Sequence, residues 1–149
     1  MKAVIQRVRR AKLTADGTPY SESNAGMLIL LGVCPEDTEK EADFLVRKCV
    51  NLRIFEDENG KMNVSPTNAA AEAMVVSQFT LMGDCSQGTR PYFGAAARPE
   101  IAEPLYRYFC DEMAKILPTK TGVFGADMQI ETVCDGPVTI LMDTKELMK

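Results

Sequence analysis

The stretch that decides the fold is Met27-Leu28-Ile29-Leu30-Leu31-Gly32-Val33, which contains no polar side chain. Strands with one face in water alternate apolar and polar residues, whereas an unbroken apolar run is typical of a strand covered on both faces. The preceding Asn24-Ala25-Gly26 is rich in turn-forming residues. The sequence therefore predicts a central buried strand over residues 27–33.

The residues before this run predict a β-hairpin. Lys2 to Thr14 is rich in β-branched side chains with polar ones between them, and Asp16-Gly17 is a hairpin-turn dipeptide. A short second strand is expected around Thr18 to Ser23.

Two amphipathic helices are expected after the central run, one following Pro35 to Thr38 and one over Pro99 to Leu117. The buried positions expected in the first helix are Ala42, Leu45, Val46, Cys49 and Val50. Those expected in the second are Ile101, Leu105, Tyr108, Phe109, Met113 and Ile116, with Glu112 breaking the pattern. Further strands are expected at Leu52 to Glu56, Ala73 to Leu81, Met128 to Cys134 and Val138 to Met142, with a tight bend at Asp135-Gly136-Pro137 and a solvated tail from Thr144.

This order of elements predicts one mixed α/β domain over residues 1–149, with helices covering one side of sheet structure. A chain of 149 residues can bury a real core without metals or disulfides. No apolar run approaches the ~20 residues of a membrane-spanning helix. The N-terminal residues Met1 to Arg7 meet a charge before any signal-peptide core could form, so cytoplasmic localisation is expected.

The absence of histidine is the most informative feature of the composition. It excludes histidine acid–base chemistry, Ser-His-Asp and Cys-His arrangements and histidine-containing zinc sites. The five scattered cysteines are typical of reduced, mostly buried thiols, and no metal or cofactor is expected. The net charge of −4 argues against broad binding to nucleic acid but allows a local contact with one nucleic-acid end.

Two stretches are the main candidates for chemistry. Ser77-Gln78-Phe79-Thr80 places hydrogen-bonding side chains at the end of an apolar strand, before the long loop Met82 to Arg98, and clefts form at such places. The simpler interpretation, which the pattern alone favours, is that Ser77 and Thr80 satisfy backbone groups. Asp135-Gly136-Pro137-Val138-Thr139 is either a hairpin turn or a cis Gly–Pro element that fixes two carbonyl groups.

Two further stretches are weaker candidates. In Thr121 to Met128 small residues allow close backbone approach, and Phe124 and Met128 are either pocket walls or, as is more frequent, core residues. Ser86 to Pro91 offers Arg90 to a phosphate but lacks the spacing of a Walker loop, so it is interpreted as a surface loop.

Several segments occur together in one known family, in the same order. They are Gln6-Arg7-Val8, Leu31-Gly32-Val33, Arg53-Ile54-Phe55, Gly60-Lys61-Met62-Asn63, Val75-Val76-Ser77-Gln78-Phe79-Thr80-Leu81, Arg90-Pro91, Leu105-Tyr106-x-Tyr108-Phe109, Thr121-Gly122-x-Phe124-x-Ala126-Asp127-Met128 and Asp135-Gly136-Pro137-Val138-Thr139. The chain thereby resembles the D-aminoacyl-tRNA deacylases (D-tyrosyl-tRNA deacylases). The S-Q-F-T-L and G-P-V-T signatures are each specific, and finding both makes coincidence implausible.

The resemblance implies a homodimeric editing hydrolase with a compact α/β sandwich of β/β/α layers and an active site at the dimer interface. Its substrate would be tRNA esterified at the 3′ CCA end with a D-amino acid or glycine, and L-aminoacyl-tRNA would be rejected. The residues implied for catalysis are Ser77, Gln78, Phe79 and Thr80. Chiral selection is assigned to Gly136 and Pro137 of the other subunit, joined by a cis bond. Phe124 and Met128 would form pocket walls, and Arg7 would brace the Gly–Pro loop. Cys134 is a departure, because relatives often have Asn there.

Two mechanisms are compatible with this set of residues. Thr80 can act as a nucleophile only with an activating base, and no such base is obvious nearby. We favour the alternative, in which the 2′-hydroxyl of the terminal ribose assists a water molecule while amides near Phe79 and Thr80 stabilise the oxyanion. The competing function is a non-catalytic module that binds a tRNA end or a small ligand. Neither DNA nor a membrane is an expected partner.

Overall fold

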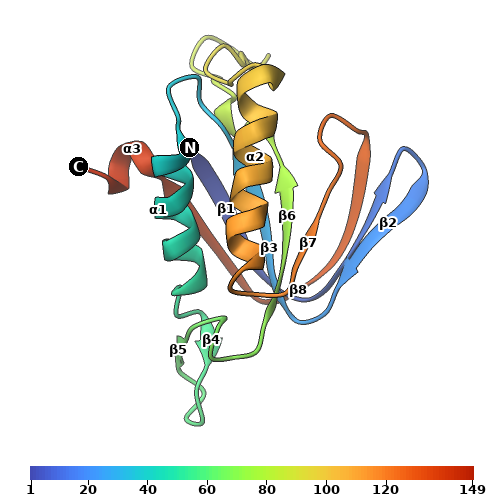
Figure 1. Ribbon diagram of the computed structural model, residues 1–149, viewed down its shortest axis with the longest axis vertical. Helices are drawn as coiled ribbons and strands as arrows, with labels where there is room; N and C mark the ends of the chain where they lie inside the picture. Colours follow the sequence, from blue (N-terminus) through green and yellow to red (C-terminus); the bar gives the residue numbers. More distant parts are fainter.

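The predicted central strand is confirmed as β3 (Gly26–Gly32) in a computed structural model that describes residues 1–149 (Figure 1). It lies inside a six-stranded sheet, and all its residues are buried except the half-buried Leu30. Its neighbours are β1 (Lys2–Ala15), which is antiparallel, and β6 (Glu72–Ser77), which is parallel. A further short strand, β7 (Thr119–Thr121), pairs in parallel with β6. The apolar run is thus buried because strands and other layers surround it on every side.

The long strands β1 and β8 (Met128–Asp143) pair antiparallel almost from end to end. The first half of β1 also pairs with β3, and its second half pairs with β2 (Thr18–Ser23). Register irregularities near Val8 bend this pair, as bulges do, and the sheet folds over on itself. A small second core lies inside the fold, on the opposite face of β3 and β6 from the helices, and consists of Val8, Ala11, Leu13, Leu28, Met74 and Val76.

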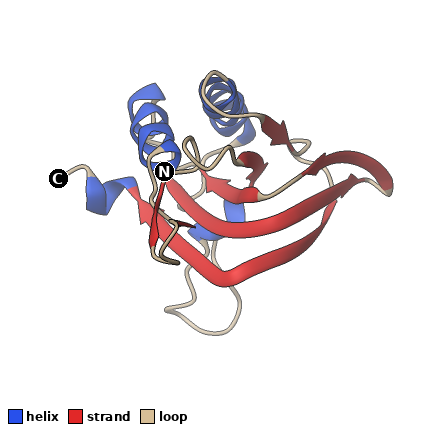
Figure 2. Cartoon of the chain, turned by 90° about the horizontal axis from the view of Figure 1, so that it is seen from below, coloured by secondary structure: helices blue, strands red, loops and turns tan.

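Helices α1 (Glu39–Val50) and α2 (Pro99–Ala114) cover the other face of the sheet (Figure 2). The five buried positions predicted for α1 are confirmed, and Thr38 and Glu41 form a capping box at its start. The predicted stripe of α2 is partly wrong, because Ile101 and Ile116 are 41% and 47% exposed. The buried residues of α2 are Ala102, Tyr106, Phe109, Cys110 and Met113. The helix ends at Ala114 instead of the expected Leu117, so Ile116 lies beyond it, and Ile101 lies on its exposed side.

The predicted bend at Asp135-Gly136-Pro137 does not divide two strands, which corrects the sequence-based expectation. Gln6 pairs with Thr139 and Val8 pairs with Cys134, so residues 135–138 bulge out of a continuous β8, opposite Arg7. Turn residues predict a local change of direction, but pairing with the long β1 on both sides keeps the strand in one ladder.

Two other strand boundaries differ from the prediction. The strand expected at residues 52–56 is only β4 (Phe55–Glu56), which pairs with the unforeseen β5 (Met62–Val64). The strand expected to reach Leu81 ends at Ser77, and a 3₁₀ turn, η1 (Phe79–Met82), follows. None of the helices is long and apolar enough to cross a bilayer.

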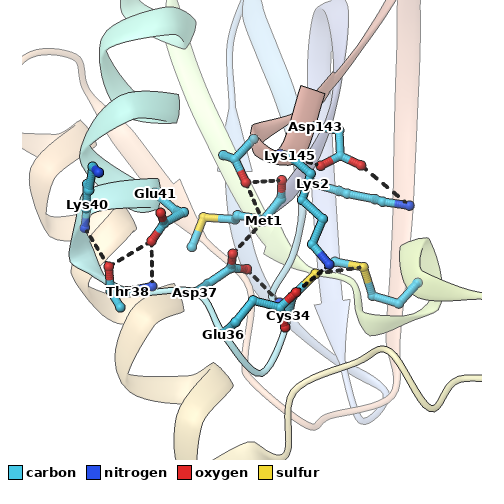
Figure 3. A network of polar contacts seen from close by, with 12 residues as sticks. Met1, Lys2, Cys34, Glu36, Asp37, Thr38, Lys40, Glu41, Asp143 and Lys145 are labelled. Carbon is cyan, nitrogen blue, oxygen red and sulfur yellow. Dashed lines mark hydrogen bonds and ion pairs between the residues drawn. The ribbon is translucent and has the colours of Figure 1, made fainter. Parts of the chain in front are cut away.

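The C-terminal tail is not a solvated end, because α3 (Thr144–Leu147) is tied to the N-terminus. The Met1 ammonium group is fully buried and donates to Asp37 Oδ1 and Thr144 Oγ1, both at 2.7 Å (Figure 3). The second oxygen of Asp37 accepts from the amide of Cys34 at 2.6 Å. This network joins the start of β1, the loop before α1 and the start of α3.

Candidate active site

The segment Ser77-Gln78-Phe79-Thr80 lies where the ladder between β3 and β6 ends. Ser77 is paired with Leu31, and the Gln78 amide donates to the Leu31 carbonyl at 2.8 Å before the chain turns into η1. Gly32 lies directly under this turn, and a Cβ atom there would be 3.0 Å from the Gln78 carbonyl oxygen. Glycine at position 32 therefore lets the turn sit close against the end of β3.

Gln78 and Thr80 are hydrogen bonded to each other through their side chains. The Gln78 Nε2 group donates to Thr80 Oγ1, so the hydroxyl hydrogen of Thr80 is free to donate elsewhere. Thr80 is exposed, and its partner is an amide donor that cannot remove a proton from it. The arrangement suits Thr80 as a hydrogen-bond donor rather than as a nucleophile.

A cavity of about 540 Å³ opens beside this turn and has the size of a small-ligand site. Ser77, Gln78 and Phe79 lie on one side of it, and Tyr106, Phe124 and Met128 line it on others. Twelve of its sixteen lining residues are hydrophobic, which suits a flat aromatic group. The structure thus brings together five of the predicted site residues, with Thr80 next to them in the turn.

Tyr106 is the one ionisable side chain among the lining residues. Burial raises its pKa, and its hydroxyl donates to the Val75 carbonyl at 2.8 Å and accepts from the Gly122 amide at 3.1 Å. A phenol held in this way stays protonated at neutral pH. The cavity therefore contains no side chain that serves as a general base.

Gly136 and Pro137 do not line this cavity, although the bond between them is cis. They bulge from β8 opposite Arg7 of β1. Arg7 pairs with Met27 of β3, and Met27 pairs in turn with Ala73 of β6. Ser77 is four residues further along β6, a separation of about 13 Å at ~3.3 Å per residue. The two signatures therefore lie toward opposite ends of the sheet within one chain.

The side chain of Arg7 is hydrogen bonded to the start of the bulge. This side chain is nearly buried, with Nε donating to the Asp135 carbonyl at 3.1 Å and Nη1 donating to the Ile54 carbonyl at 2.7 Å. The carboxylates of Asp135, at 3.5 Å, and Glu56, at 3.9 Å, balance its charge. Arg7 thus links the bulge to the segment that leads into β4.

Residues 4–143 match the family model described as D-Tyr-tRNA(Tyr) deacylase. The chain belongs to this family. A curated relative, the D-aminoacyl-tRNA deacylase of Desulfatibacillum aliphaticivorans, is 50% identical over 146 residues, which cover 97% of this chain and 100% of the relative. Membership of the family makes the protein a hydrolase of the aminoacyl-tRNA deacylase class.

Two solved structures share the fold of this chain. A c-Myc DNA unwinding element binding protein matches with a TM-score of 0.91 and 44% identity, covering 96% of this chain and 98% of the other. A probable eukaryotic D-amino acid tRNA deacylase matches with a TM-score of 0.84 over 95% and 97% of the two chains. At 15% identity, the second match shows that the fold is shared.

Two residues of the site are not predicted as site residues from the sequence. Gly32 and Tyr106 stand in segments that match the family, but the pattern gives neither of them a role in the site. For Tyr106, the available indication of a special role is its hydroxyl group within an apolar helix face, because a buried tyrosine hydroxyl needs hydrogen-bond partners. Gly32 carried no local indication, since its importance comes from a turn that lies far away in the sequence.

Proposed function

We propose that the protein hydrolyses the ester bond of D-aminoacyl-tRNA and of glycyl-tRNA, and spares L-aminoacyl-tRNA. The observation that carries the proposal is the Ser77-Gln78-Phe79-Thr80 signature on the rim of an apolar cavity that has no general base. A nucleoside fits a cavity of about 540 Å³, so we place the terminal adenosine of tRNA there, between Phe124 and Met128.

Catalysis in this proposal relies on the substrate. The 2′-hydroxyl of the terminal ribose assists the attacking water, because no cavity side chain can take its proton. Backbone amides around Phe79 and Thr80 stabilise the oxyanion, and the free hydroxyl hydrogen of Thr80 orients the ester.

Chiral selection requires a second copy of the chain. Since Gly136 and Pro137 lie far from Ser77 in one chain, we propose a homodimer in which each bulge reaches the partner's cavity. Two carbonyl oxygens of the bulge would accept hydrogen bonds from the substrate's amino group. An L side chain would then collide with main chain, whereas a D side chain or the hydrogen of glycine would not, so the identity of the side chain would not matter.

The partner is expected to be the 3′ end of tRNA in the cytoplasm, contacted locally. A net charge of −4 does not favour many phosphate contacts, so tRNA binding should weaken only modestly as salt is raised. For the same reason duplex DNA is not proposed as a ligand of this chain.

Hydrolysis of D-tyrosyl-tRNA and of L-tyrosyl-tRNA by the purified protein, with EDTA present, tests the activity. Loss of the D ester alone is the expected result. Survival of both esters in the presence of measurable tRNA binding would contradict the proposal and favour the non-catalytic binding module.

Complementation tests the shared site. Gly32→Ala is designed to disturb the turn at residues 78–80 in one chain. Arg7→Ala is designed to disturb the bulge at residues 135–138 in the other chain. Mixing the two variants should raise the activity well above that of either variant alone, because one site of each mixed dimer combines an intact turn with an intact bulge. A mixture no more active than its components would show that the site lies within one chain.

A further inference from the structure

The cavity wall formed by residues 122–127 is a loop that connects β7 to β8. Phe124, Gly125 and Ala126 of this loop line the cavity. At the beginning of the loop, the Gly122 amide donates to the Val75 carbonyl at 3.0 Å. Inside the loop there is only one weak backbone bond, from the Ala126 amide to the Val123 carbonyl at 3.2 Å. The position of the wall therefore depends on the packing of Phe124 against Tyr106 and on what holds the end of the loop.

Asp16 holds that end through two hydrogen bonds to Asp127. The backbone amide of Asp16 donates to the Asp127 carbonyl at 2.8 Å, and the Asp127 amide donates to Asp16 Oδ1 at 3.0 Å. The first bond continues the ladder of β1 and β8 beyond the pair of Ala15 and Met128. In the second bond, the side chain of Asp16 accepts from a residue that lies 111 positions away in the sequence.

The hairpin turn by itself does not require an aspartate at position 16. Asp16 and Gly17 have φ values of +48° and +79°, and Asn or Gly meets this requirement as well as Asp does. The carboxylate oxygen thus has a partner outside its own turn, at the edge of the cavity wall.

We propose that Asp16 is a positioning residue that fixes the end of the 122–127 loop and so holds Phe124, Gly125 and Ala126 as the wall of the substrate cavity. The consequence for substrate binding rests on the proposed function, whereas the attachment of the loop does not. Because the wall contacts the bound nucleoside and not the ester, loosening it should raise KM and leave kcat nearly unchanged.

Two substitutions at Asp16 separate the hydrogen bond from the turn. Asp16→Asn keeps an oxygen acceptor and tolerates the left-handed backbone, whereas Asp16→Gly keeps the backbone and removes the acceptor. In Asp16→Gly we expect faster hydrogen exchange at the Asp127 amide and a KM for D-tyrosyl-tRNA raised about three- to tenfold, the effect of one lost hydrogen bond. Asp16→Asn should match the unaltered protein in both measurements.

The proposal is overturned if Asp16→Gly leaves both the exchange of the Asp127 amide and the KM unchanged, or if Asp16→Asn is impaired as much as Asp16→Gly. A measurement on the unaltered protein does not depend on any variant folding. The Asp127 amide should exchange more slowly than the amide of the exposed Gly125, and equal rates would overturn the attachment. If the unaltered protein hydrolyses neither ester, the proposed function fails, and the exchange data still decide the role of Asp16.

Discussion

The side chain of Arg7 donates from Nε to the backbone carbonyl of Asp135 at 3.1 Å, and Asp135 directly precedes Gly136 and Pro137. A charged donor with a nearly buried side chain thus fixes the start of the bulge that we assign to chiral selection. The same guanidinium donates to the Ile54 carbonyl at 2.7 Å, so the bulge and the segment before β4 are held as one unit.

Replacing Arg7 by lysine should lower kcat/KM for D-tyrosyl-tRNA about 10- to 100-fold. Lysine keeps the charge but cannot donate in the two fixed directions that reach Asp135 and Ile54. Arg9→Lys is the matched control, because Arg9 also contacts Asp135 but is 73% exposed, and it should have little effect. Equal activity of the two variants would show that the bulge needs no brace.

Replacing Gly32 by alanine should lower kcat tenfold or more while the protein still folds, because complete loss of one oxyanion donor costs about 10²–10³ in kcat and a displaced donor loses part of that. The new Cβ would lie 3.0 Å from the Gln78 carbonyl and 3.2 Å from Leu81 Cβ, so the turn must move. Single-turnover kinetics and a thermal melt of the same sample separate loss of activity from loss of fold. Unchanged kinetics would mean that the turn can shift without consequence.

Thr80→Ala should retain measurable activity, at about 1–10% of the unaltered protein. The variant loses a hydrogen-bond donor to the substrate, worth about 1.5–3 kcal/mol when the acceptor carries charge, but no nucleophile. Rapid-quench mass spectrometry of the unaltered enzyme should find no acyl group on Thr80. Complete loss of activity together with a trapped acyl-Thr80 adduct would reverse the assignment.

Asp37→Ala should reduce the free energy of unfolding by about 3–5 kcal/mol, since it leaves the fully buried ammonium group of Met1 without its counter-charge. Urea denaturation measures this difference. Glu36→Ala is the control, because the ion pair of Glu36 with Lys145 is exposed and its loss should change stability little. Similar stability of the two variants would contradict the role given to Asp37.

Stability should fall above pH 9 because of the buried thiols. Burial raises the pKa of Cys49 from 9.0 to about 12. Between these values the thiol ionises in the unfolded chain but not in the folded protein, so its stabilising effect is complete below pH 9 and is lost as the pH rises toward 12. Cys49→Ala should be less stable at pH 8 but should show a shallower decline between pH 9 and 11. Parallel declines in urea denaturation would contradict this explanation.

Local pattern was sufficient for some elements and misleading for others. Three features followed from the local sequence, because each depends on neighbouring residues. They are the strand β3, from its apolar run, the turn at Asp16-Gly17, from its residue types, and the buried face of α1, from its spacing. The buried face of α2 was predicted only in part, because packing against the sheet decides which side of the helix is covered.

The candidate site shows the same division. The polar residues at the end of an apolar strand, together with the family resemblance, pointed to Ser77 and Thr80, and the absence of histidine limited the chemistry to schemes without that base. The cavity beside them could not be predicted, because its walls come from β6, α2 and the 122–127 loop, which meet only after folding.

The sequence by itself thus determined the type of domain, the central strand and the set of possible catalytic groups, since these follow from composition and period. Only the tertiary structure decided that Asp135-Gly136-Pro137 is a bulge in one strand, that it lies away from Ser77, and that Asp16 reaches Asp127. Each of these depends on pairing with β1 across more than a hundred residues, and no local preference of the chain specifies that pairing.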